Sequence, residues 1–163
     1  MRDRRVGVET DDVWHDDRRI HYENQMIVDI LDSSIEIDES YVVEPAAEIH
    51  RQLREYERGE RFTFDLEVTV PNGLTGRVMT AMASIPYGET RTYGDLAETL
   101  DTAPIAIGGA CGRNPVPIVV PCHRVVGHDG GLRGYSGGAG VSTKRELLEL
   151  EARNAPSLST SEL

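Results

Sequence analysis

The sequence predicts an α+β fold in which a small amino-terminal α/β domain precedes a helical domain with a helix-turn-helix. Residues 44–60 have the apolar spacing of an amphipathic helix, and residues 61–70 alternate apolar and polar side chains as a half-buried strand does. Residues 74–100 hold two further helical patterns, and the breakers Pro71, Asn72 and Gly73 precede them. We expect an α/β domain at residues 1–72, a second domain at residues 73–153 and a disordered tail at residues 154–163.

Length and hydropathy suit a soluble protein with one good core or two small domains. The chain has 163 residues, of which 39% are hydrophobic. No stretch reaches the about 18 apolar residues of a membrane span, and the charged start MRDRRVGVETDD lacks the apolar core of a secretory signal. We therefore expect a cytoplasmic protein that does not bind a membrane.

The charge is strongly acidic and unevenly distributed. The chain holds 28 acidic against 17 basic residues, a net charge of −11, and Lys144 is its only lysine. Residues 1–84 carry 10 bases and 19 acids, whereas residues 85–151 carry 6 and 8. Such repulsion is screened in concentrated salt, where the Debye length falls to about 3 Å at about 1 M. This favours a halophilic protein; the alternative is an ordinary acidic protein that prefers arginine.

The cysteines and histidines do not have the spacing of a metal site. There are two cysteines, Cys111 and Cys122, with no CxxC, and none of the five histidines pairs with a cysteine or carboxylate at ligand spacing. The sequence therefore predicts neither a disulfide framework nor a zinc site, and we expect no metal and no cofactor.

The amino-terminal part contains two candidate strands, then a helix and a third strand. The segments RRIHY (residues 18–22) and QMIVDIL (residues 25–31) are the candidate strands. The helix begins at Pro45, which a first helical turn tolerates, and ends at Gly59. Three residues at i, i+4 and i+7 form its apolar face: Ile49, Leu53 and Tyr56. The alternating strand at residues 61–70 follows.

The second part begins with helices. Residues 74–85 place four apolar side chains on one face: Leu74, Val78, Met82 and Ile85. In TYGDLAETL, Thr92 and Asp95 have the spacing of a capping box, and APIAIGGAC follows as a second short helix. The face of this second helix is small enough to lie close against another surface: Ala106, Gly109 and Ala110. The pair resembles a helix-turn-helix, and the alternative is an ordinary helical hairpin.

The stretch GRNPVPIVVPCHRVVG places a thiol beside basic residues. Its prolines leave little room for a helix, so Ile118 to Val120 are expected to form a brief buried strand with Cys122 at its end. A free cysteine is usually a small buried hydrophobe. Here the neighbours His123 and Arg124 favour a thiolate nucleophile instead, although a contact between Cys122 and His123 requires a bend in the strand.

Four motifs together carry a resemblance to a known family. PCHRVVG, GGACGRNPVPIVV, IPYGETRTYGDLA and GYSGG resemble the O6-alkylguanine-DNA alkyltransferases, in the same order and over Leu74 to Glu151. The resemblance implies a winged helix-turn-helix-like alkyltransferase domain behind a ribonuclease H-like amino-terminal domain. It implies DNA repair by a monomer that moves an alkyl group from O6 of guanine in double-stranded DNA irreversibly onto its own cysteine, once per molecule.

The resemblance assigns roles at the reacting thiol. Cys122 matches the alkyl acceptor, His123 the histidine that draws the thiol proton through a water, and Glu151 the glutamate that orients this histidine. The local pattern agrees, because Thr143 and Glu146 have capping-box spacing and predict a helix over residues 144–152. Leu147 and Glu151 then share a face of that helix.

Further roles concern the guanine and the loop that holds the cysteine. Tyr93 matches the tyrosine that donates a proton to the guanine, and Asn114 the asparagine that braces the turn at the cysteine. Tyr135 and Ser136 match the loop that walls the base pocket. The carbonyls of Cys122 and Val125 match acceptors for the guanine amino group.

The resemblance also implies a DNA-binding surface, with one departure. Ile105 stands where the family carries the arginine that fills the space of the extruded nucleotide, and an apolar wedge can also open a base step. The other expected DNA contacts are Gly109, Ala110, Arg113 and Arg124. Two alternatives are a non-enzymatic sensor of alkylguanine, which would lack the acceptor cysteine, and a cysteine hydrolase, which would need an oxyanion hole.

Overall fold

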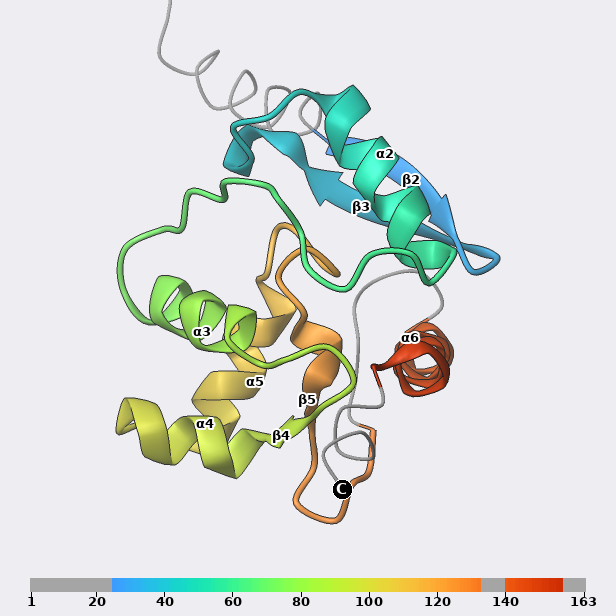
Figure 1. The fold of residues 1–163 in the computed structure, drawn as a ribbon. Coiled ribbons are helices and arrows are strands. Elements are labelled where there is room, and N and C mark those ends of the chain that lie inside the picture. The colour runs from blue at the N-terminus through green and yellow to red at the C-terminus, as the bar shows by residue number, and fades with distance from the viewer. Residues whose placement is uncertain (1–24, 133–139, 157–163) are drawn as a thin grey trace, which may run out of the picture.

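The computed structural model describes residues 25–132 and 140–156 and has a mixed fold of helices with two small sheets (Figure 1). The candidate strand at residues 18–22 lies outside these ranges, as does most of the predicted tail. Within the described ranges, no helix combines the length and hydropathy that crossing a membrane requires.

The described chain starts with an antiparallel hairpin of β2 (Gln25–Ile30) and β3 (Ser33–Asp38). Its two-residue loop, Leu31 and Asp32, has φ values of 50° and 62°. Positive φ at both positions matches the right-handed twist of the two strands. The residues facing the core alternate along each strand, as the predicted strand at residues 25–31 requires: Met26, Val28, Ile30, Ile35 and Ile37.

Helix α2 (Ala46–Glu57) lies against the hairpin, after the 3-10 turn η1 (Glu39–Tyr41) (Figure 1). Pro45 is its N-cap, and the predicted helix at residues 45–59 is confirmed. The three residues of the predicted apolar face are all buried: Ile49, Leu53 and Tyr56. Helix α2 contacts β2, whereas Tyr56 near its end packs against Phe64 and Tyr87.

The strand predicted at residues 61–70 is wrong as a strand. In the described part of the chain this segment forms one isolated antiparallel bridge, Val42 with Val68, and Val43 N donates to Glu67 O at 2.9 Å. The side chain of Gln52 takes the place of a neighbouring strand, because it pairs with both backbone groups of Asp65. Alternate side chains of the segment are still half-buried. The two-residue period of the sequence therefore predicted which side chains are buried, but not whether another strand pairs with the segment.

Three helices follow: α3 (Leu74–Ala83), α4 (Tyr93–Leu100) and α5 (Pro104–Gly112). They lie together on the side of the molecule away from the hairpin (Figure 1). The capping box is confirmed, because Thr92 Oγ1 accepts from Asp95 N at 2.9 Å and Asp95 Oδ2 accepts from Thr92 N at 3.0 Å. This capping fixes where α4 starts.

The strand predicted at residues 118–120 is also wrong. The segment is a buried turn in which Ile118 has a φ of +76°, a left-handed conformation that costs a β-branched residue energy. Cys122 begins a 3-10 turn, η2 (Cys122–Arg124), which leads into β5 (Val125–Val126). β5 pairs in parallel with β4 (Arg91–Thr92), directly before α4. This pairing places η2, which we call the cysteine turn, next to the first turn of α4.

Helix α6 (Val141–Asn154) starts earlier than predicted. Its N-cap is Gly140, without a side-chain cap, so the predicted capping box of Thr143 and Glu146 is wrong. Thr143 lies inside the helix, where its Oγ1 is 2.9 Å from Ser33 Oγ of the hairpin. The Thr143 hydroxyl, which was predicted to cap the helix, hydrogen-bonds to Ser33 instead.

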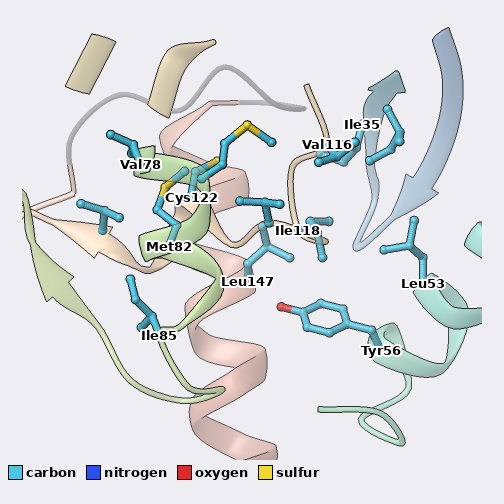
Figure 2. Packing of buried hydrophobic residues seen from close by; sticks show 14 of the residues in the cluster. Ile35, Leu53, Tyr56, Val78, Met82, Ile85, Val116, Ile118, Cys122 and Leu147 are labelled. Carbon is cyan, nitrogen blue, oxygen red and sulfur yellow. The ribbon is translucent and has the colours of Figure 1, made fainter. Parts of the chain in front are cut away.

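One hydrophobic core joins the amino-terminal segment (residues 25–72) to the segment that follows it. Figure 2 shows Leu53 and Tyr56 of α2 on one side, Val78 of α3 on the other, and Ile118 and Leu147 between them. A backbone bond from Asp38 N to Pro115 O at 2.9 Å also links the segments. The division into domains at residues 72 and 153 stays a prediction.

Candidate active site

Cys122 lies at the start of η2 in a turn that side-chain hydrogen bonds hold in place. It is 6% exposed, and its backbone N donates to Val120 O at 2.8 Å. Asn114, itself buried, closes the turn: its Nδ2 donates to Val120 O at 2.8 Å and its Oδ1 accepts from Val116 N at 3.0 Å. These are the contacts that the predicted brace requires. Together they fix the backbone position of the thiol.

His123 is fully buried next to Cys122 and binds Glu151. Its Nε2 lies 2.7 Å from Glu151 Oε2 on α6, so the sequence prediction correctly paired residues 28 apart in the chain. Because η2 replaces the expected extended strand end, Cys122 and His123 do not point to opposite faces of a strand. The structure therefore brings together Cys122, His123 and Glu151.

Glu151 is the centre of a larger hydrogen-bond network. Five donors of the described chain reach its two oxygens: Arg124 Nε (2.9 Å), Arg124 Nη2 (2.9 Å), His123 Nε2 (2.7 Å), Tyr56 Oη (2.6 Å) and Gly88 N (3.1 Å). Gly88 reaches the carboxylate with a φ of +84°, and a Cβ there would lie 2.8 Å from the side chain of Ala155. Only glycine fits this approach.

The network sets the charges of Glu151 and His123. Burial raises the pKa of Glu151, but the hydrogen bonds and positive charge of His123 and Arg124 outweigh burial and lower the pKa to about 2. Burial also lowers the pKa of His123, by more than its bond to Glu151 raises it. At neutral pH the site therefore contains a carboxylate and a neutral imidazole.

The free nitrogen of His123 can accept a proton. A carboxylate accepts only, so the pair with Glu151 places the imidazole hydrogen on Nε2 and leaves the lone pair on Nδ1. Nδ1 is buried and has no hydrogen-bond partner among the described residues. The arrangement is that of a general base, with Glu151 ready to stabilise the imidazolium that forms.

Arg124 was expected to contact DNA, and the structure corrects this expectation. Its side chain is 6% exposed and forms a bidentate ion pair with Glu151. Its Nη1 donates to Ile85 O at 2.6 Å. The guanidinium points into the protein because Glu151, buried on α6, requires a cationic partner.

Tyr93 is the first residue of α4 and lies beside the only lysine of the chain. Lys144 Nζ donates to Tyr93 Oη at 3.4 Å and lies 5.6 Å from the centre of the Tyr93 ring. Lys144 is 1% exposed on α6. Sequence reasoning did not assign Lys144 to the site. The available signal was that the only lysine among the 17 basic residues lies shortly after the GYSGG motif in the sequence.

The expected DNA contacts divide between the surface and the core. Ile105, in the first turn of α5, is 86% exposed, and Gly109 and Arg113 are exposed. Arg113 Nε donates to Thr75 Oγ1 at 3.1 Å. Ala110 was expected on the same surface, but it is fully buried, because its side of α5 packs onto the core.

Two of the expected base-binding residues, Tyr135 and Ser136, lie outside the described residues. Val125, expected to offer its carbonyl, is in β5 with its side chain fully buried. Within residues 25–132 and 140–156, no three histidine, cysteine or carboxylate side chains gather as metal ligands.

The second cysteine, Cys111, belongs to the packing. It is half-buried on α5, where its thiol donates to Met82 Sδ at 3.5 Å. Burial raises its pKa to about 12. Cys111 therefore remains a protonated thiol at neutral pH and is a poor nucleophile.

Comparisons with known proteins agree with these features. Residues 74–153 match the family model described as "6-O-methylguanine DNA methyltransferase, DNA binding domain". The methylated-DNA--protein-cysteine methyltransferase of Mycobacterium tuberculosis is 47% identical over 64% of this chain and 64% of its own length. That of Methanosarcina acetivorans is 41% identical over 76% of this chain and 77% of its own length. The match to the mycobacterial relatives thus spans slightly less than two thirds of their length.

Solved structures give the same assignment. The crystal structure of Mycobacterium tuberculosis O6-methylguanine methyltransferase has a TM-score of 0.68 at 34% identity and covers 82% of this chain and 94% of that chain. The structure of Mycobacterium tuberculosis OGT in complex with DNA has a TM-score of 0.62 at 45% identity, over 68% and 69% of the two chains. The resemblance inferred from four motifs is confirmed, and the chain belongs to the family of the methylated-DNA--protein-cysteine methyltransferases.

Proposed function

We propose that this protein repairs DNA by moving a methyl or other alkyl group from O6 of guanine onto Sγ of Cys122, irreversibly and once per molecule. The relatives named above are methylated-DNA--protein-cysteine methyltransferases, and one of the solved structures is in complex with DNA. The observation that carries the proposal is the buried pair of His123 and Glu151 directly beside Cys122.

The proposed reaction begins with removal of the thiol proton. His123 Nδ1 takes the proton of Cys122 through a water, and the carboxylate of Glu151 stabilises the resulting imidazolium. Sγ then attacks the alkyl carbon in line, a carbon–sulfur bond forms and the carbon–oxygen bond to guanine breaks. Tyr93 donates a proton to the guanine as negative charge leaves with it. The thiol proton held by His123 replaces the proton that Tyr93 has given to the guanine, so no net charge is left in the site. The thioether on Cys122 is stable.

We also propose a domain organisation for the chain. We infer a ribonuclease H-like domain at residues 1–72, a winged helix-turn-helix-like domain at residues 73–153 and a disordered tail after it. Tyr135 and Ser136 wall the base pocket, and the carbonyls of Cys122 and Val125 accept from the guanine amino group. The protein acts as a cytoplasmic monomer of a halophilic cell.

The DNA-binding surface is α4 and α5. We propose that Ile105, Gly109 and Arg113 contact the duplex, since all three are exposed on or directly after α5. The charge of residues 85–151, 6 bases against 8 acids, makes this half nearly neutral. Binding therefore depends more on backbone N–H groups and close fit than on counterion release, and its salt dependence is shallow.

The alternative of a non-enzymatic damage sensor is less well supported. A sensor needs the base pocket but neither the thiol nor a proton acceptor, and this chain has Cys122 next to a buried His123–Glu151 pair. A cysteine hydrolase would use the same pair but would turn over many substrate molecules.

Mass spectrometry tests the proposal directly. The protein is incubated in high salt with a duplex that contains one O6-methylguanine, and its peptides are weighed. We expect a gain of one methyl group on the peptide with Cys122, and at most one methyl per molecule. Cys122→Ser should lose the transfer, whereas Cys111→Ala, the matched loss of the other thiol, should keep it. Unmodified substrate, or substrate consumed in excess of protein, contradicts the proposal.

A further inference from the structure

A tyrosine of the amino-terminal segment reaches the buried network behind Cys122. Tyr56 lies on α2 and is fully buried, and its Oη is 2.6 Å from Glu151 Oε2. The same Oη lies 3.5 Å from His123 Nε2. Figure 2 shows the hydroxyl of Tyr56 pointing away from α2 into the space between the two segments. The residues in contact are 95 positions apart in the chain.

The direction of this hydrogen bond follows from the two ionisable groups. Burial and the charge of Glu151 raise the pKa of Tyr56 well above its ordinary value, so its hydroxyl keeps its proton. Glu151, with a pKa of about 2, is an acceptor. Tyr56 therefore donates to Oε2, the oxygen that also receives His123 Nε2. Three donors share this oxygen, since Arg124 Nη2 also donates to Oε2 at 2.9 Å, and each weakens the hold of that oxygen on the others.

The fold holds Tyr56 firmly. Its ring packs against Phe64, with ring centres 5.6 Å apart, and edge-on against Tyr87 at 6.0 Å. Helix α2 is tied to the hairpin by Glu57 Oε2, which accepts from Leu31 N at 3.0 Å. The hairpin is in turn tied to α6 through Ser33. Each of these contacts restricts how far the hydroxyl can move from Glu151.

We propose that Tyr56 is a positioning residue of the alkyl-transfer site, through which the amino-terminal segment holds the Glu151 carboxylate and limits its pull on the His123 imidazole. The inference rests on the function proposed above. It gives the amino-terminal segment a part in the chemistry, whereas the family resemblance implies little catalytic role for it.

Removal of the hydroxyl should change how His123 titrates. Without Tyr56 as a donor, Glu151 Oε2 binds the His123 N–H more strongly and stabilises the imidazolium, so the pKa of His123 rises. Only the neutral imidazole accepts the thiol proton. As the pH is lowered, the rate of transfer in the variant therefore starts to decrease at a higher pH than in the unmodified protein. The other ionisable groups around the pair remain in place: Cys122, Arg124, Lys144 and Tyr87.

The experiment compares two tyrosines that each lose only a hydroxyl. Methyl transfer is timed for the full chain, for Tyr56→Phe and for Tyr87→Phe between about pH 5 and about pH 9. The hydroxyl of Tyr87 is also buried, but it has no hydrogen-bond partner among the described residues. We expect Tyr56→Phe to shift the acid-side midpoint of the rate to higher pH and to lower the rate at about pH 6 by about tenfold. Tyr87→Phe should leave the midpoint unchanged.

A third variant separates positioning from simple destabilisation. Leu53→Ala removes buried packing from the same helix and should lower the melting temperature without moving the midpoint. An unchanged midpoint in Tyr56→Phe, or a shift to lower pH, overturns the inference. If the unmodified protein transfers no methyl group at any pH, the proposed function fails instead, so the two failures are distinguishable.

Discussion

At the scale of single residues, the site is organised around one buried carboxylate. Glu151 is fully buried, and its charge is kept by Arg124 on one side and His123 on the other. The sequence predicted Cys122, His123 and Glu151 correctly as neighbours, because the motif places two of them side by side and the family resemblance pairs the third with His123. It misplaced Arg124, because a basic residue of a proposed DNA-binding protein is expected to face DNA. In the structure Arg124 instead points inward and forms an ion pair with the buried carboxylate of Glu151.

Ile105 is the residue at which the DNA-binding prediction can be tested. The side chain is 86% exposed, and the family resemblance implies an arginine at this position. We expect Ile105→Arg to raise the rate of repair of a duplex by about three- to tenfold in low salt and to steepen the log–log salt slope by about 0.9, since one cation is added at the DNA surface. Timed methyl transfer from duplex substrate at several salt concentrations measures both.

The matched control for Ile105 is Ile27→Arg. Ile27 is 52% exposed on β2, so the variant adds the same charge away from α5. If Ile27→Arg and Ile105→Arg raise the rate equally, the gain comes from net charge alone, and Ile105 is not at the position that opens the duplex.

At the scale of elements, the start of α4 shows how local sequence places a site residue. Thr92 and Asp95 cap the helix reciprocally, and Tyr93 is the first residue inside it. Both β4 residues, Arg91 and Thr92, pair with β5, which directly follows the cysteine turn. The capping box was predictable because it depends on two residues three positions apart. The pairing with β5 was not, since two residues do not make a readable strand pattern.

Loss of the cap should destabilise the protein by a modest amount. We expect Thr92→Ala to lower the free energy of unfolding by about 1 kcal/mol, and the melting temperature by about 2–4 °C. Thr99→Ala, in the exposed part of the same helix, removes only a hydroxyl that bonds back to Asp95 O and should cost less. Urea unfolding of the three proteins measures the difference. Equal losses in both variants would mean that the cap adds nothing to α4.

At the scale of the whole molecule, charge and core are distributed differently. The net charge of −11 is concentrated in residues 1–84, whereas the hydrophobic core runs through both segments without a break. Surface repulsion therefore acts mainly on the amino-terminal segment. That segment is held to the rest by shared apolar side chains and by the buried bond of Tyr56 with Glu151.

Salt should therefore stabilise the folded protein. We expect the free energy of unfolding in urea to rise by about 1–2 kcal/mol between about 0.1 M and about 1 M KCl, where the Debye length falls to about 3 Å, and then to level off. Near pH 4.8, close to the isoelectric point of the sequence, the gain should be much smaller. A stability that does not depend on salt at neutral pH would contradict the halophilic interpretation.

The sequence by itself determined the helices at residues 45–59 and 74–85 and the cap at Thr92, because each depends on residues within a few positions of one another. The tertiary structure decided the remaining features. Residues 61–70 keep the burial period of a strand but lack a strand to pair with, and Ile118 adopts a left-handed turn that no period predicts. Tyr56 reads as an ordinary core residue of an amphipathic helix. Only the tertiary fold brings its hydroxyl to a carboxylate 95 positions away, because periodicity specifies which side chains are buried and not which partners they meet.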